Sequence, residues 1–298
     1  MSRQQLRSDS PPPMALNRSI GGKRGYLHLG FERDPLDGKT ILRSLDRRAP
    51  MVVQQALYWD EQLPQMACVY TLSSGGPLVD GDRYDCRVHL SCGAEAHISS
   101  GASTLIASMN HDCVEIERSA TLAAHSYLEW LPESTIPCRR SRSRSTTRIV
   151  VDPTASLFWA EQFCCGRLHY GELFDFEQFS QQTIVAREDG RVLLRESARI
   201  TPSEFTPLRG GILGGFTHWA TIYIVAPRPV VEALYKATKP HYHSRHALGI
   251  SLLAASEGVV VRILGYSAEE LKADVRTLCG EFRRIVKGVP MDAEFPWR

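Results

Sequence analysis

The sequence predicts a mostly β fold that ends in one or two helices. From Gly25 to about Val225, short alternating or apolar runs are separated by Gly, Pro, Asp and Ser, which is the pattern of strands joined by turns. Apolar residues at helical spacing appear only after this stretch. Because strands and helices do not alternate, the pattern argues against a βαβ fold with a phosphate-binding loop.

Five runs carry the clearest strand signal, because their residues are apolar or alternate between apolar and polar. These runs are Ala67–Leu72, Asp85–Leu90, His97–Ser99, Thr146–Val151 and, late in the chain, Gly258–Leu264.

Two helices are expected in the C-terminal half. The first, Pro229–Lys239, opens with proline, which suits a first helical turn. The second, Ser267–Val286, starts with a serine and has Glu270 three residues later, which is a capping pattern. One face of the second helix should pack on the rest of the domain, through Leu271, Val275, Leu278, Phe282 and Ile285.

Length and composition indicate one large domain behind a short tail. The chain has 298 residues, of which 43% are hydrophobic and 23% charged, as in ordinary globular proteins. Residues 1–22 combine Pro11-Pro12-Pro13 with Ser, Gln and Gly, and such a segment buries too little apolar surface to offset the entropy lost on ordering. We therefore expect a disordered tail over residues 1–22 and a single domain over 23–298.

Charge and cysteine content point to a cytoplasmic protein with reduced thiols. The 35 Lys and Arg nearly balance 33 Asp and Glu, so no global field favours nucleic acid or a membrane surface. No apolar run approaches the roughly 18 residues of a membrane-spanning helix, and the N-terminus lacks the apolar region of a signal peptide. The eight cysteines show no CxxC spacing, which fits buried free thiols better than disulfides or zinc.

A histidine cluster offers one reading as a metal-dependent enzyme. His241, His243 and His246 lie close enough in sequence to share a transition metal. The alternative is a polar loop after Pro240, because no acid or cysteine nearby in sequence completes a ligand set. No GxSxG or HExxH motif supports a hydrolase.

An arginine–serine tract at residues 139–148 offers another reading, as an RNA-binding module. If the tract is a strand, Arg140, Arg142 and Arg144 share one face and the serines between them share the other. No aromatic residue is interleaved with the tract, so a strand that faces solvent or a protein partner, or that protects a sheet edge, is favoured over RNA binding.

The most specific pattern is spread over the chain. It consists of Gly75-Gly76-Pro-Leu-Val-Asp80-Gly81-Asp82, Leu128-Glu129-Trp-Leu-Pro-Glu133 and Gly166-Arg167-Leu-His-Tyr-Gly171-Glu172. In this order the three stretches resemble the signatures of the UreD (UreH) family of urease accessory proteins. Gly38–Thr40 with residues 50–58 resembles the family's opening strands, and residues 248–253 with 260–265 resemble its closing segment.

One stretch departs from the family pattern. Residues 97–104 resemble a threonine-rich strand of the family, but Ser99 and Ser100 replace threonines and Leu105 stands where a lysine is common. Any role that the family gives to this lysine is therefore in doubt here.

The resemblance covers roughly Lys23 to the C-terminus. It implies a β-helix-like stack of strands with two C-terminal-half helices packed at one end. It also implies a non-catalytic scaffold that binds UreF, reaches the GTPase UreG through UreF, and docks on the subunits of apo-urease. Nickel would pass through an internal polar passage to the urease site, so the chain would hold nickel transiently and no tightly bound cofactor.

Four carboxylates in the matching motifs are candidates for this passage. Asp82 and Glu172 come first, and Asp80 and Glu129 could substitute for either. Oxygen ligands suit a passage because a Cys or His cage that selects nickel tightly would not release it. The alternative for each is a structural ion pair, such as Glu172 with Arg167.

Overall fold

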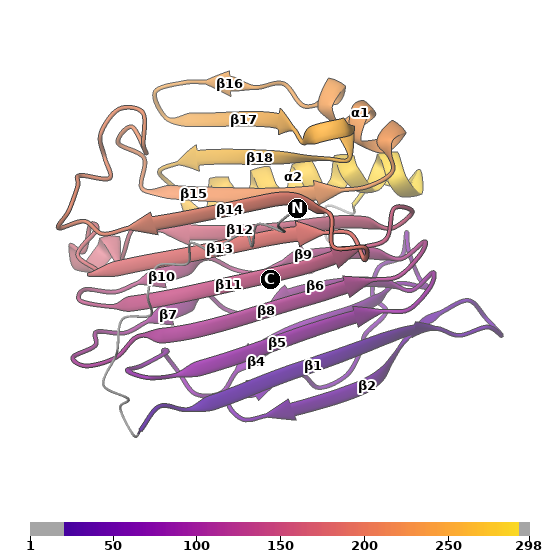
Figure 1. Ribbon diagram of the computed structural model, residues 1–298, viewed down its shortest axis with the longest axis horizontal. Coiled ribbons are helices and arrows are strands. Elements are labelled where there is room, and N and C mark those ends of the chain that lie inside the picture. Colours follow the sequence, from indigo (N-terminus) through magenta and orange to yellow (C-terminus); the bar gives the residue numbers. More distant parts are fainter. Residues whose placement is uncertain (1–20, 292–298) are drawn as a thin grey trace, which may run out of the picture.

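The computed structural model describes residues 21–291, which form two stacked β-sheets with two helices on one outer face (Figure 1). Most of the predicted tail, residues 1–20, lies outside the described residues. The first sheet has seven strands, in the spatial order β14 (Val192–Ile200), β13 (Gln178–Ala186), β11 (Arg142–Val151), β8 (Val114–Leu122), β5 (Arg83–Leu90), β1 (Arg24–Arg33) and β2 (Thr40–Arg48).

The second sheet has eleven strands. Its main path is β16 (His241–Tyr242), β17 (His246–Leu252), β18 (Gly258–Gly265), β15 (His218–Val225), β12 (Ser156–Cys164), β9 (Tyr127–Leu131), β6 (Glu95–Ser100), β4 (Ala67–Ser73) and β3 (Met51–Val52). Two short strands, β7 (Thr104–Ile106) and β10 (Thr135–Pro137), pair beside this path.

The central strands of both sheets run parallel although no helix connects them. Parallel pairs join β1, β5, β8, β11 and β13 in one sheet and β4, β6, β9 and β12 in the other. From β4 to β13 the chain alternates between the two sheets. Each time it returns to a sheet within this stretch, the new strand lies beside the strand that the chain last formed in the main path of that sheet. This coiling is the predicted β-helix-like stack, and it provides the long crossover that parallel pairing requires.

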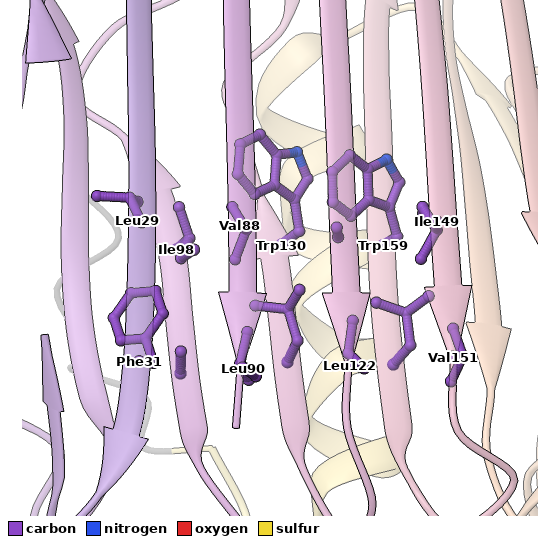
Figure 2. Close-up of a cluster of buried hydrophobic side chains, with 14 of the residues drawn as sticks. Leu29, Phe31, Val88, Leu90, Ile98, Leu122, Trp130, Ile149, Val151 and Trp159 are labelled. Carbon is purple, nitrogen blue, oxygen red and sulfur yellow. The ribbon is translucent and has the colours of Figure 1, made fainter. Parts of the chain in front are cut away.

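Alternating side chains build the core between the two sheets. Figure 2 shows Leu29, Val88 and Ile149 of the seven-stranded sheet near Ile98, Trp130 and Trp159 of the other. Trp130 and Trp159 stack with their ring centroids 4.5 Å apart. Burial of each large apolar side chain stabilises the fold by about 1.5–3 kcal/mol.

Both helices pack against the eleven-stranded sheet, near its β12–β17 end (Figure 1). Helix α1 spans Arg228–Ala237 and helix α2 spans Ala268–Lys287. The predicted cap of α2 is confirmed, because the Ser267 side chain accepts a hydrogen bond from the Glu270 N–H. Its predicted apolar face is also confirmed: four of the five residues are buried and Ile285 is partly buried.

The five predicted strands are confirmed and extend up to four residues beyond the predicted bounds. The cysteines are free thiols, and all except Cys92 are buried. No helix within residues 21–291 is long and apolar enough to cross a membrane.

Candidate functional site

A layer of polar side chains crosses the space between the two sheets. In the seven-stranded sheet, strand register aligns Arg118, Thr147, Thr183 and Glu196 in one row. In the other sheet, register aligns Glu161, Thr221 and Arg262. The two rows meet where the Thr147 hydroxyl donates to Glu161 Oε1 at 3.2 Å. The layer therefore forms a polar band between apolar layers of the core.

Three cavities follow this layer. The first, of ≈320 Å³, and the second, of ≈30 Å³, share Arg118 and Trp130 among their lining residues. Glu161 lines the second cavity, and its register partner Thr221 lines the third, of ≈420 Å³. The smallest of the three cavities is therefore the one that Glu161 lines.

Glu161 is the one carboxylate on β12, a strand whose nine residues are all buried. Its Oε1 accepts hydrogen bonds from Thr147 and from Trp159 Nε1, the latter at 3.4 Å. Its Oε2 has no hydrogen-bond partner among the described residues. Burial raises the pKa of Glu161, although the nearby Arg118 opposes the shift. The site thus presents a carboxylate with one unsatisfied oxygen at the smallest cavity.

Other polar atoms in the layer are also unsatisfied among residues 21–291. They are the Thr183 hydroxyl and Glu196 Oε2. A buried polar atom without a partner costs about 1–3 kcal/mol, and this cost falls when water or an ion occupies the adjacent space. Cavities lined by such atoms are therefore suited to water and to a hydrated cation.

Asp82 lies at the start of the fold rather than among the residues that line the three cavities. It is fully buried, and its carboxylate accepts the N–H groups of Lys23 at 2.7 Å and Val79 at 2.9 Å. Lys23 Nζ lies 3.0 Å from the same carboxylate. A Cβ on Gly22 would lie 1.9 Å from the Gly81 carbonyl oxygen, so the glycine permits this close approach. These contacts fix the chain at the beginning of β1.

Asp80 has a comparable set of backbone partners. Its carboxylate accepts the N–H groups of Asn110, His111 and Asp112 at 3.1, 3.0 and 2.6 Å. Burial alone would raise the pKa of Asp80, but these three hydrogen bonds outweigh it and lower the pKa.

Glu129 belongs to a fully buried ion network between β9 and α2. Arg283 of α2 donates to both carboxylate oxygens, at 2.8 and 2.6 Å, and also donates to Asp60 at 2.5 Å. His97 Nδ1 lies 2.7 Å from Glu129 Oε2, and the Tyr127 hydroxyl donates to Oε1 at 2.5 Å. Burial would raise the pKa of Glu129, but Arg283 and His97 together hold it well below its ordinary value.

Glu172 forms an ion pair with Arg167, which was the structural alternative to a passage role. Arg167 Nε and Nη2 donate to the two carboxylate oxygens at 2.9 and 2.5 Å, and the Arg139 N–H donates at 3.2 Å. The Arg167 bonds lower the pKa of Glu172. The structure does not bring the four predicted carboxylates into one site, and none of them lines the three cavities. Their passage role stays a prediction.

The arginine tract requires two corrections. Arg140 has a φ of 57° and lies in the turn before β11, so it does not share the strand face of Arg142 and Arg144. Strand β11 lies between β8 and β13 in the interior of its sheet, so the tract protects no sheet edge. The predicted alternation holds within the strand, because the intervening serines are buried. Arg142 pairs with Glu177 at 2.5 Å, and Arg144 lies 3.6 Å from Glu115.

Two residues of the histidine cluster, His241 and His246, form a chain of hydrogen bonds with Asp274, and the ring centroid of His243 lies 5.4 Å from that of His241. His241 Nε2 lies 2.7 Å from His246 Nδ1, and His246 Nε2 lies 2.7 Å from Asp274 of α2. A metal bound tetrahedrally to both imidazoles would hold the two nitrogens about 3.3 Å apart, since each bond is about 2.0–2.1 Å. Among residues 21–291, no group of three His, Cys, Asp or Glu side chains could hold a metal ion.

Sequence reasoning missed Arg118, Glu161 and Glu196. One signal could have found Glu161, because a lone carboxylate in an apolar strand such as Ser156–Cys164 must have a partner or a function. No local signal identifies Arg118 and Glu196, because only the strand register places them in the same row.

Comparison with known proteins agrees with the motif resemblance. The family model described as UreD urease accessory protein matches residues 23–298. Urease accessory protein UreD 2 of Brucella suis biovar 1 (strain 1330) is 32% identical over 297 residues, covering 98% of each chain. Urease accessory protein UreD 3 of Methylorubrum populi is 33% identical over 299 residues, covering 99% of this chain and 96% of the relative. A family match over most of the chain, together with relatives of nearly equal length, shows that this protein belongs to the UreD family of urease accessory proteins.

Proposed function

We propose that the protein is a non-catalytic cytoplasmic scaffold that docks on apo-urease together with UreF and UreG and conducts nickel to the urease site. The polar layer between the sheets is the proposed route. One observation carries this proposal: the buried Glu161, whose Oε2 is unsatisfied among the described residues, lines the smallest of three cavities along the polar layer.

The chemistry of the layer suits brief passage of Ni²⁺. Its lining offers carboxylate, hydroxyl and amide oxygens, for example from Glu161, Thr183 and Gln181. Nickel binds such oxygens less tightly than imidazole or thiolate ligands, so the ion can leave each position. A hydrated ion also requires space, which the first and third cavities provide.

The four carboxylates predicted from the motifs have a different place in this proposal. Asp82, Asp80, Glu129 and Glu172 already accept two or more hydrogen bonds each. Such contacts support a scaffold role, in which these residues hold turns and the α2 helix beside the route.

The outer face of the seven-stranded sheet is the proposed partner-contact face. Arg142 and Arg144 lie on this face, and both helices pack against the other sheet. No observation favours the RNA-binding or metal-enzyme alternatives. Arg142 and Arg144 pair with carboxylates, and His246 bonds to both His241 and Asp274.

The test is Glu161→Gln, which keeps the side-chain size but removes the ionisable oxygen. The protein should still fold and co-purify with UreF and urease subunits, while the nickel content and activity of urease fall. The exposed Glu188 provides the matched control, Glu188→Gln, which should load nickel at the wild-type level. Wild-type nickel loading by the Glu161→Gln protein would reject the route.

A further inference from the structure

Each carboxylate of the polar layer that has an unsatisfied oxygen shares a cavity lining or an ion pair with an arginine of the same layer. Arg118 and Glu161 both line the second cavity, and the charge of Arg118 acts on Glu161. At the open edge of the layer, Arg262 Nη2 lies 2.9 Å from Glu196 Oε1. A dication that enters therefore meets a guanidinium next to each carboxylate.

Arg118 lies beside the second cavity without an ion pair to a carboxylate among residues 21–291. Its Nη1 donates to the Ser145 hydroxyl at 3.1 Å. The residue lines both the first and the second cavity. Because the second cavity has a volume of only ≈30 Å³, a cation that binds Glu161 there would lie close to the Arg118 guanidinium.

We propose that Arg118 is a nearby counter-charge that weakens the binding of a divalent cation at Glu161 and so shortens the stay of the cation in the second cavity. This inference rests on the proposed function, since it assigns the release step of the same route. Arg118 is then a positioning residue that sets how tightly the route holds its cargo.

The charges of the proton and of the dication predict how the loss of Arg118 changes the affinity of Glu161 for nickel. Coulomb repulsion scales with the product of the charges, so Arg118 repels a dication about twice as strongly as it repels a proton. Removal of Arg118 strengthens proton binding to Glu161 as well as nickel binding, but it strengthens nickel binding more. Neutralising this arginine should therefore trap nickel rather than speed its transfer.

The experiment compares Arg118→Gln with the wild-type chain, each co-purified with its partner proteins. The substitution removes the positive charge, and the new amide still offers a donor to the Ser145 hydroxyl. Equilibrium dialysis against Ni²⁺ should show roughly tenfold tighter binding, since one neighbouring opposite charge changes carboxylate affinity by about one to three pKa units. Transfer of nickel to apo-urease should become slower. The double variant Arg118→Gln with Glu161→Gln should lose the extra binding.

Two controls separate charge from fold. Arg118→Lys keeps the charge and should bind and release nickel as the wild type does. Arg195→Gln removes an exposed charge from β14 and should change neither quantity. Unchanged nickel affinity in Arg118→Gln would overturn the inference, and so would an Arg118→Gln protein that cannot fold while Arg118→Lys folds, because the charge would then serve the scaffold.

The outcome for Glu161→Gln alone distinguishes the two proposals. If this variant delivers nickel normally, the proposed route fails whatever Arg118→Gln does. If it blocks delivery while Arg118→Gln holds no more nickel than the wild type, the route stands and only the counter-charge role of Arg118 fails.

Discussion

Arg283 joins helix α2 to the eleven-stranded sheet through two buried carboxylates, and we predict that its loss strongly destabilises the fold. The side chains of Arg283, Glu129 and Asp60 are all 0% exposed. Arg283→Met keeps an apolar side chain beside the sheet but removes the guanidinium from both carboxylates. The variant must then bury uncompensated negative charge or bind protons.

The magnitude follows from this burial. Breaking a buried ion pair by removing one partner costs about 3–5 kcal/mol. For a domain of this size each kcal/mol lowers the melting temperature by roughly 2–4 °C, so the expected decrease is roughly 6–20 °C. The exposed Arg284, which pairs with Glu281, is the matched control, and Arg284→Met should change the melting temperature by roughly 2 °C or less.

Thermal unfolding followed by circular dichroism measures this prediction. The triple variant Arg283→Met, Glu129→Gln, Asp60→Asn removes the stranded charges and should recover part of the lost stability. If Arg283→Met melts as the Arg284→Met control does, the network contributes little and the reasoning is refuted.

The network also predicts a pH dependence. The pKa of Glu129 is lowered in the folded protein, so its stabilisation is present above the ordinary carboxyl pKa and is lost as pH falls through the lowered value. In Arg283→Met, burial without the guanidinium should raise the pKa of Glu129. Proton uptake by Glu129 should then reduce the destabilisation of the variant as pH falls. The difference in stability between wild type and variant should therefore narrow from neutral to acidic pH.

Two further predictions concern the motif carboxylates and the arginine strand. Asp82→Ala leaves the Lys23 and Val79 N–H groups without their acceptor, so the free energy of unfolding should fall by about 1–3 kcal/mol. A stable Asp82→Ala protein that binds its partners but leaves urease poor in nickel would instead support the passage role. The same two outcomes distinguish the scaffold and passage roles of Glu172 in Glu172→Ala. Arg142→Glu with Arg144→Glu should weaken pull-down of UreF and urease while circular dichroism stays unchanged; normal pull-down would exclude this face from docking.

The sequence by itself determined the elements of this fold and its family. Strands and helices leave periods of two and 3.6 in the chain, so runs such as Asp85–Leu90 and Ser267–Val286 could be assigned without tertiary information. One glycine-containing motif had a local cause as well, since Arg167 and Glu172, which form an ion pair, both lie within Gly166–Glu172.

Only the tertiary structure decided which charges meet. The position of β11 inside its sheet depends on pairing with β8 and β13, each about one coil away in sequence. Glu161 acquires its neighbours from strands of the opposite sheet, and Glu129 meets Arg283 across 154 residues. The free energy of a buried charge depends on partners brought close by folding, and the period of a strand shows which face a residue occupies but not what lies opposite it.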